Sequence, residues 1–439
     1  MSAQPTINRR VWTLAWPVVL SNLTVPLVGA VDTAVVGHLD AAFYIGGVAL
    51  GSLLFNYIYW GFGFLRMGTT GFVAQAKGAG DGTEVLASLG RALLLSLFFG
   101  GICLALTAPM ADFAFSILDG SDEVEEAARS YFMIRVWAAP AALCNFSVLG
   151  WLFGMQAMRG GLVQQVVINS VNVALNLIFV LGLGWGIEGV ALATVIAQYV
   201  GLLVGAVLVW RLAPRDVRLP RLRELAAVRR LKAMMAVNRD IFIRTLAVLT
   251  ASAFFMNESA RLGDTVLAAN AVFLIFKSVA GYGLDGYAHA AEALVGEAIG
   301  RRSRVQLRAA VIATTKGAAV LAVLMTVLFF AGGSLFIDLM TSIQAVRDVA
   351  RDYLPWAAAI PLVAVWSFQL DGMFIGATRG AEMRNGMLIA LTVFVAVAWP
   401  LTDLYGNHGL WAAYCLFLLV RAGTMALYYP RLERGLAAR

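Results

Sequence analysis

Charged residues are scarce in this chain. Asp, Glu, Lys and Arg make up 13% of its 439 residues, whereas 60% are hydrophobic. Soluble domains carry about 25% charged residues, so a soluble protein of this size would have too few charges to cover its surface. The mean hydropathy of +0.79 instead suits an exterior that faces lipid. The composition excludes a sizeable soluble domain and indicates a polytopic membrane protein.

Cysteine is rare, and the common catalytic motifs are missing. Cys103, Cys144 and Cys415 lie far apart within apolar runs and show no metal-ligand spacing. The sequence contains no Walker A, HExxH or GxSxG pattern. We therefore predict neither a metal centre nor a bound cofactor. ATP-driven transport by this chain alone and an intramembrane enzyme are both disfavoured.

Segments long enough to cross a bilayer fill almost the whole chain. A transmembrane helix needs about 20 mostly apolar residues. Twelve stretches meet this length, near 11–36, 44–72, 87–109, 127–156, 162–183, 187–210, 234–256, 264–299, 307–337, 350–377, 384–404 and 409–429. We predict two six-helix lobes, 1–213 and 233–439, joined by a basic cytosolic linker at 214–232.

Basic residues gather in alternate gaps between these stretches. They occupy the N-terminus, the even-numbered loops and the C-terminus, whereas the third loop is acidic, with Asp112, Asp119, Asp122 and Glu123 among its residues. The positive-inside rule therefore predicts that both termini face the cytosol. The same rule accounts for the net charge of +7 without a nucleic-acid partner, which we exclude.

The two halves repeat each other in sequence. GFGFLRMGTTGFVAQAKG at 61–78 aligns with GLDGYAHAAEALVGEAIG at 283–300, an offset of 222. MRG at 158–160 aligns with TRG at 378–380, an offset of 220. Because each half has an even number of spans, both enter the membrane in the same direction, as in parallel-repeat transporters. The predicted fold is an all-α polytopic membrane protein with twelve transmembrane helices in two parallel-repeat six-helix bundles.

One carboxylate lies deep within the first predicted span. Asp32 follows Pro26 and Gly29 in the run VPLVGAVDTAVVGHL. Charge inside the bilayer is costly and usually functional, and a proline lets a helix bend. A carboxyl beside a bendable helix can act as a proton or cation switch. The alternative is a hydrogen-bonded structural Asp, or one near enough to the outer interface to be wet.

Neutral polar residues gather on the fifth and sixth spans. Asn169, Asn172 and Asn176 are three and four residues apart, which places them on one helical face. Thr194 and Gln198 lie on the next span. With Asp32 these side chains could line a polar pocket in the first lobe. The alternative is interhelical hydrogen bonding, which membrane helices use for packing.

The second lobe has its own ionisable residues. Lys277, Asp285, His289 and Glu292 share one face of a predicted span, and Asp371 lies on the tenth span. Such a stripe suits a water-filled cleft that binds substrate, or a proton relay. The alternative is charge pairing that neutralises buried groups, for example Lys277 with Asp285 or with Asp371.

Several phrases resemble the multidrug and toxic compound extrusion (MATE) family of transporters. LTVPLVGAVDTAVVGHLDAAFYIGGVALG resembles the first helices of that family. FLRMGTTGFVAQAKGAGD, ALCNFSVLGWLFGMQAMRG and LDGYAHAAEALVGEAIG resemble its DinF branch. The resemblance covers nearly the whole chain. It implies two six-helix bundles in a bacterial cytoplasmic membrane and efflux of drugs or toxic metabolites, coupled to protons or sodium.

The resemblance also implies roles for individual residues. In the family the Asp of the first helix couples transport to a cation, and Asp32 matches it; Pro26 matches the bend site, and Asn172 and Thr194 match pocket residues. Relatives often have a second acid where this chain has Asn176. An Asn cannot release a proton, and a sodium site would lose one negative ligand. We therefore favour protons, with sodium at Asp32 as the alternative.

We thus predict a monomeric antiporter in which proton entry drives the exit of organic cations, drugs or toxic metabolites. Its partners would be membrane lipid and small amphiphilic or cationic substrates. A flippase for lipids or lipid-linked precursors would need a cleft with several basic residues, and the sequence shows few arginines in mid-membrane. The remaining alternatives are a sodium-coupled exporter and a membrane enzyme or receptor subunit without transport.

Overall fold

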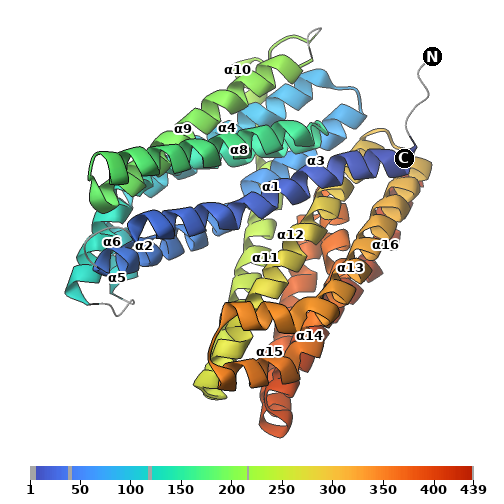
Figure 1. The fold of residues 1–439 in the computed structure, drawn as a ribbon. Coiled ribbons are helices and arrows are strands. Elements are labelled where there is room, and N and C mark those ends of the chain that lie inside the picture. The colour runs from blue at the N-terminus through green and yellow to red at the C-terminus, as the bar shows by residue number, and fades with distance from the viewer. Residues whose placement is uncertain (1–5, 38–41, 117–120, 215–216, 438–439) are drawn as a thin grey trace. The chain divides into compact units, whose positions relative to one another are not determined.

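The fold is all-α throughout the part of the chain that the structure describes. The structure is a computed structural model, and it describes residues 6–37, 42–116, 121–214 and 217–437. The side chains at 23, 25–34, 36, 42, 222 and 437 lie outside that description. Every regular element in it is a helix (Figure 1).

The helices follow one another with short connections. In the first half they are α1 (Ile7–Val36), α2 (Ala42–Gly61), α3 (Phe64–Gly78), α4 (Gly82–Ala105), α5 (Thr107–Phe115), α6 (Asp122–Arg135), η1 (Val136–Ala138), α7 (Ala139–Gly154), α8 (Met158–Asn176), η2 (Leu177–Gly182) and α9 (Gly186–Leu212). After the short α10 (Leu222–Leu225) come α11 (Val228–Arg261), α12 (Asp264–Gly300), α13 (Arg304–Met340), α14 (Gln344–Gly376), α15 (Gly380–Tyr405) and α16 (Asn407–Ala437).

The predicted membrane spans correspond to these helices. Among the described residues, 11 helical segments are long and apolar enough to cross a membrane. They match the second to twelfth predicted spans one for one, from Phe43–Gly78 to Asn407–Leu436. The first predicted span, 11–36, falls within α1. The all-α polytopic membrane fold is confirmed.

The chain forms two compact units. We call Leu20–Val73 with Asp81–Ala233 the N-unit, and Met1–Val19, Ala74–Gly80 and Met234–Arg439 together the C-unit. Helix α1 therefore begins in the C-unit and continues into the N-unit. The lobe boundaries expected from the sequence, 1–213 and 233–439 with the linker 214–232, stay a prediction.

The internal repeat is visible in the helix boundaries. Helices α2 and α12, α4 and α13, α6 and α14, and α8 and α15 each begin 222 residues apart. Turn residues with positive φ repeat at the same spacing: Gly80 and Arg302, Gln156 and Thr378, Gly184 and Gly406. Because Gln156 and Thr378 occupy equivalent turns, the offset of 222 holds there too. The alignment of MRG with TRG at an offset of 220 is therefore wrong by two residues.

Equivalent helix starts also use equivalent caps. The Asp81 side chain accepts a hydrogen bond from the backbone N–H of Glu84 across 2.9 Å at the start of α4. At the start of α13, Ser303 accepts from the N–H of Gln306 across 3.3 Å. Both are the first half of a capping box, in which a polar side chain satisfies a free N–H of the first turn. The repeat thus extends to the groups that fix where helices begin.

The two repeats differ in helix continuity. In the first, single predicted spans are broken between α2 and α3, between α4 and α5, and at η1 between α6 and α7. Their counterparts α12, α13 and α14 are unbroken, with 37, 37 and 33 residues. The hydropathy pattern predicted each span but could not locate these breaks, since an apolar run continues across each of them.

Glycines let equivalent helices cross closely in both repeats. A Cβ on Gly150 of α7 would overlap the carbonyl oxygen of Arg66 in α3, and one on Gly372 of α14 would overlap that of Ala288 in α12. The residues of the two pairs are again 222 apart. Backbones can approach this closely only at residues without a side chain, as is common where membrane helices pack.

The stretch predicted as a linker packs against α4. Arg91 of α4 donates to the carbonyl oxygen of Glu224 in α10 across 3.0 Å. Arg230 and Arg91 both pair with Glu84, and Arg218 pairs with Glu224. This dense basic stretch is therefore held to the N-unit by paired charges.

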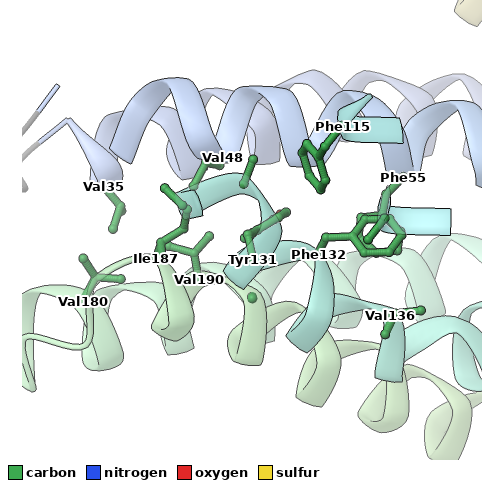
Figure 2. Close-up of a cluster of buried hydrophobic side chains, with 14 residues drawn as sticks. Val35, Val48, Phe55, Phe115, Tyr131, Phe132, Val136, Val180, Ile187 and Val190 are labelled. Carbon is green, nitrogen blue, oxygen red and sulfur yellow. The ribbon is translucent and has the colours of Figure 1, made fainter. Parts of the chain in front are cut away.

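A buried apolar cluster holds the N-unit helices around the end of α1. Val35 of α1 is 4% exposed and belongs to the same cluster as Val48 of α2, Tyr131 of α6, and Ile187 and Val190 of α9 (Figure 2). Burying one such aliphatic side chain contributes about 1.5–3 kcal/mol. The cluster therefore fixes the last turn of α1 against three other helices.

The close helix crossing predicts the effect of filling a glycine. We expect Gly150→Ala to lower stability by about 1–3 kcal/mol, because overpacking forces backbones apart. Gly101→Ala is the matched control on a helix: nothing lies within 4 Å of its added Cβ, so it should be neutral or stabilising by up to about 1 kcal/mol. Thermal unfolding of the purified variants in detergent measures both. Equal melting temperatures would contradict the tight crossing.

Candidate functional site

Helix α1 is fixed to the N-unit on either side of its predicted functional residues. Before them, Nδ2 of Asn169 in α8 donates to Oγ1 of Thr24 across 2.9 Å. After them, Val35 lies in the buried N-unit cluster. The side chains of Pro26 and Asp32 lie outside the described part of the structure, so their roles stay predictions. The two anchors hold α1 to α8 at Thr24 and to the N-unit cluster at Val35.

That polar face carries a short hydrogen-bonded chain. Asn172 and Asn176 are 4% and 0% exposed. Nδ2 of Asn176 donates to Oδ1 of Asn172 across 3.3 Å, and Nδ2 of Asn172 donates to Oγ1 of Thr194 in α9 across 3.1 Å. Thr194 donates to the carbonyl oxygen of Val190 across 3.2 Å. The chain joins two helices and contains three of the five residues that the sequence grouped together.

Gln198 takes part in a separate network. Nδ2 of Asn145 in α7 donates to Oε1 of Gln198 across 2.9 Å, and Nε2 of Gln164 in α8 donates to Oδ1 of Asn145 across 3.0 Å. This network links α7, α8 and α9 through amides alone. The geometry favours the packing interpretation of Gln198 over a place in the polar pocket.

A π-helix follows Asn176 directly. Residues Leu177–Gly182 form η2, and the N–H of Leu183 donates to the carbonyl oxygen of Ile178, five residues back, across 2.9 Å. Short π-helical insertions are frequent at functional sites. This one could not be predicted from the sequence, since the apolar run LIFVLG has no proline and ends at its only glycine.

Asp371 in the C-unit is held by two arginines. One carboxylate oxygen, Oδ2, pairs with both Arg244 of α11 and Arg421 of α16. All three side chains are largely buried, at 14%, 7% and 10% exposure for Arg244, Arg421 and Asp371. The sequence interpretation overlooked both arginines. Each lies inside a predicted span, where a charged residue is costly and therefore a functional candidate, as Asp32 is. Arginines in mid-membrane are therefore less scarce than expected.

Lys277 does not make either ion pair that was suggested for it. Its Nζ lies over the ring of Tyr414 in α16, 5.0 Å from the centroid, a cation–π contact. Asp371 is taken by arginines, and no ion pair joins Lys277 to Asp285 among the described residues. That pairing was wrong because the faces that meet in three dimensions are set by helix packing, which spacing along one helix does not reveal.

Other acids of the C-unit have basic neighbours. Nδ1 of His289 lies 3.1 Å from Oε1 of the buried Glu292 on α12, so these two predicted residues do come together. Glu258 pairs with Arg261 at 2.8 Å and accepts from Nε1 of Trp399 across 3.1 Å. Asp285 is half-buried on the same helix as His289.

Glu297, at the end of α12, holds the start of α1. One of its carboxylate oxygens lies 2.8 Å from Arg10 and the other 2.6 Å from Arg301. Its side chain is 7% exposed. The ammonium of Lys77 at the end of α3 also interacts electrostatically with this carboxylate. Three basic residues therefore surround one buried carboxylate at the basic end of the C-unit.

Comparison with known proteins places the chain in a family. The MatE family model matches residues 17–178 and 241–401, one copy in each half. The chain is 39% identical to DNA damage-inducible protein F of Escherichia coli K12 over 424 residues, which covers 97% of this chain and 92% of that protein. It is 24% identical to a probable multidrug resistance protein NorM of Acinetobacter baylyi, covering 94% of this chain and 95% of that one.

Solved structures share the fold. A MOP superfamily transporter from Pyrococcus furiosus superposes with a TM-score of 0.86 at 21% identity, covering 99% of this chain and 97% of that one. An outward-facing multidrug resistance MATE transporter superposes with a TM-score of 0.87 at 19% identity, covering 99% and 98%. With two copies of the family model and the apolar helices, these likenesses make the chain a transporter rather than an enzyme. It belongs to the MATE family of multidrug and toxic compound efflux transporters, in the DinF branch.

Proposed function

We propose that this transporter is a proton-driven antiporter that exports organic cations, drugs or toxic metabolites, with Asp32 as its coupling residue. The observation that carries the proposal is the pair of anchors on α1, at Thr24 and Val35. Asp32 lies between them. The helix that bears it is thus held inside the N-unit, against α8.

The register along the two helices supports this placement. Asp32 is eight residues beyond Thr24, a rise of about 12 Å, and Asn176 is seven residues beyond Asn169, a rise of about 10 Å. Because α1 and α8 are the first and fifth spans, we expect them to run in the same direction. Asp32 would then lie level with the chain of Asn172, Asn176 and Thr194, which supplies neutral polar groups around its carboxyl.

The chemistry of that chain favours protons over sodium. A sodium site is built from oxygen ligands and gains from a second negative charge, as hard cations prefer. Here Oδ1 of Asn172 already accepts from Asn176, and Oγ1 of Thr194 accepts from Asn172. Asn176 adds no charge. A single carboxylate beside neutral amides suits a proton better than a metal ion.

The paired acids of the C-unit also support coupling through Asp32. Asp371, Glu258 and Glu297 each pair with at least one arginine. An acid that alternates between protonated and ionised forms must lose and regain its stabilising contacts, and a fixed guanidinium opposes this. Asp32 is the intramembrane acid for which we propose that role.

Coupling follows if the two ligands favour opposite states. Ionised Asp32 would favour substrate binding, and protonated Asp32 would favour a state of low substrate affinity. A proton that binds from the outside then releases the substrate to the outside, and the proton is later released into the cytosol. We propose that the protein acts as a monomer in a bacterial cytoplasmic membrane with both termini in the cytosol, as the charge distribution predicts.

Neutralising Asp32 should uncouple export. In vesicles with an imposed pH gradient, we expect wild-type protein to move a fluorescent organic cation and Asp32→Asn to reduce the gradient-driven rate by about 100-fold or more, within the range of positioned proton-transfer groups. Asp112→Asn is the matched control: Asp112 is an exposed carboxylate paired with Arg129, and its loss should leave the rate unchanged. Equal rates in wild type and Asp32→Asn would reject the proposal.

Restoring a second acid should broaden ion use. We expect Asn176→Asp to make export respond to a sodium gradient, because it adds the negative ligand that a sodium site lacks here. Wild type should show no response to sodium at constant pH. Asn169→Asp, one turn of helix away from Asn172 on the same face, tests whether any added charge suffices. Sodium-driven export by the wild type would show that the coupling ion was wrongly assigned.

A further inference from the structure

The cluster of Arg244, Asp371 and Arg421, here called the arginine triad, carries an excess of positive charge. Two guanidinium groups face one carboxylate. Among the described residues no second carboxylate lies within ion-pair distance of either arginine. Asp240, one turn earlier on α11, is paired with Arg384 at 2.7 Å. The triad therefore holds one uncompensated positive charge among three membrane-spanning helices.

The triad also leaves hydrogen-bonding groups unused. Both arginines bind the same oxygen of Asp371, while its Oδ1 and the Nε of each guanidinium are buried without a partner. Leaving a buried polar group unsatisfied lowers stability, and a charged group lowers it more. A guanidinium presents its donors as a planar fork that matches the two oxygens of an oxyanion. The two Nε–H groups left over are donors that a second anion would use.

A further cation lies over the same helix. Lys277 contacts the ring of Tyr414, which precedes Arg421 by seven residues on α16 and so lies two turns away on the same face. Its ammonium has no carboxylate partner among the described residues. Positive charge therefore extends along this face of α16 beside an aromatic ring. Such a surface suits a ligand that has an apolar body and an anionic group.

We propose that the arginine triad binds the anionic group, such as a carboxylate, of an amphiphilic small molecule that the transporter exports. Asp371 acts as the internal counter-ion, and the ligand takes its place on one or both guanidinium groups. The proposal rests on the export function proposed above and extends its substrates from cations to amphiphiles with an anionic group. Arg244, the most exposed member of the triad, would meet the ligand first.

Because Asp371 and the ligand compete for the same guanidinium groups, substitutions of Asp371 and of an arginine should change anion affinity in opposite directions. Arg421→Gln leaves a neutral pair of Arg244 and Asp371, so it should weaken anion binding without leaving an unpaired buried charge. Asp371→Asn removes the competitor and should strengthen anion binding. A triad that served packing alone would bind no anion in either variant.

The test is equilibrium binding to the purified full-length protein in nanodiscs of zwitterionic lipid, measured by calorimetry at neutral pH. The probes are 2-naphthoate and 2-naphthamide, which share a ring system and differ in charge. We expect wild type to bind the naphthoate at least about tenfold more tightly than the amide, as charge-assisted hydrogen bonds allow. Arg421→Gln should abolish that preference, and Asp371→Asn should increase naphthoate affinity.

Two further variants keep the result interpretable. Arg129→Gln removes an exposed arginine that pairs with Asp112 and should change nothing. Arg244→Gln replaces Arg421→Gln if the latter does not fold. Arg421→Lys keeps the positive charge but loses the planar guanidinium, so it should bind naphthoate with intermediate affinity. Equal binding of naphthoate and naphthamide by wild type would overturn the proposal, as would unchanged binding in both triad variants.

The experiment separates this proposal from the coupling mechanism and from lipid binding. Binding at equilibrium needs no gradient, so Asp32→Asn should retain the preference for naphthoate even when its export fails. Adding an anionic phospholipid to the nanodiscs distinguishes sources of the anion. If the affinity for naphthoate is unchanged, the ligand is a free organic acid. If anionic lipid displaces naphthoate in proportion to its amount, the triad binds lipid headgroups instead.

Discussion

A charge that enters a bilayer loses its water, and the penalty, still several kcal/mol per ion after relaxation, decides where ionisable groups can lie in this molecule. In the C-unit the penalty is met by pairing: Glu258 contacts Arg261 and Trp399, and Glu297 lies between Arg10 and Arg301. We propose that charges without such a partner, as in the excess cation of the arginine triad, have functional roles.

The repeat explains how one chain builds two units with different chemistry. Helix starts, positive-φ turns, caps and glycine crossings recur 222 residues apart, so the backbone scaffold is common to both halves. The polar side chains placed on it are not. The N-unit has amides and a hydroxyl on α8 and α9, whereas the C-unit has guanidinium groups around Asp371. Under our proposals, the shared frame would let one half exchange a cation while the other binds substrate.

The membrane-spanning helices could be predicted from the sequence, because a helix that faces lipid appears as an apolar run. The phrases that resemble the MATE family indicated how these helices form two bundles. The grouping of Asn172, Asn176 and Thr194 followed from helical spacing and holds in the structure. The partners of Asp371 and Lys277 did not follow, since they come from α11 and α16 and depend on how those helices pack. The π-helix after Asn176 and the break between α2 and α3 are changes in backbone conformation, which the hydropathy pattern does not predict.

If substrate and proton compete through Asp32, substrate binding must release protons, and the number released can be measured. Calorimetric titration of an organic cation into the purified protein, repeated in buffers of different ionisation enthalpy, counts the protons released. The account predicts a release of up to about one proton per substrate in the wild type and none in Asp32→Asn, as linkage between two ligands requires. Binding by the wild type without proton release at any pH, or an unchanged release in Asp32→Asn, would contradict it.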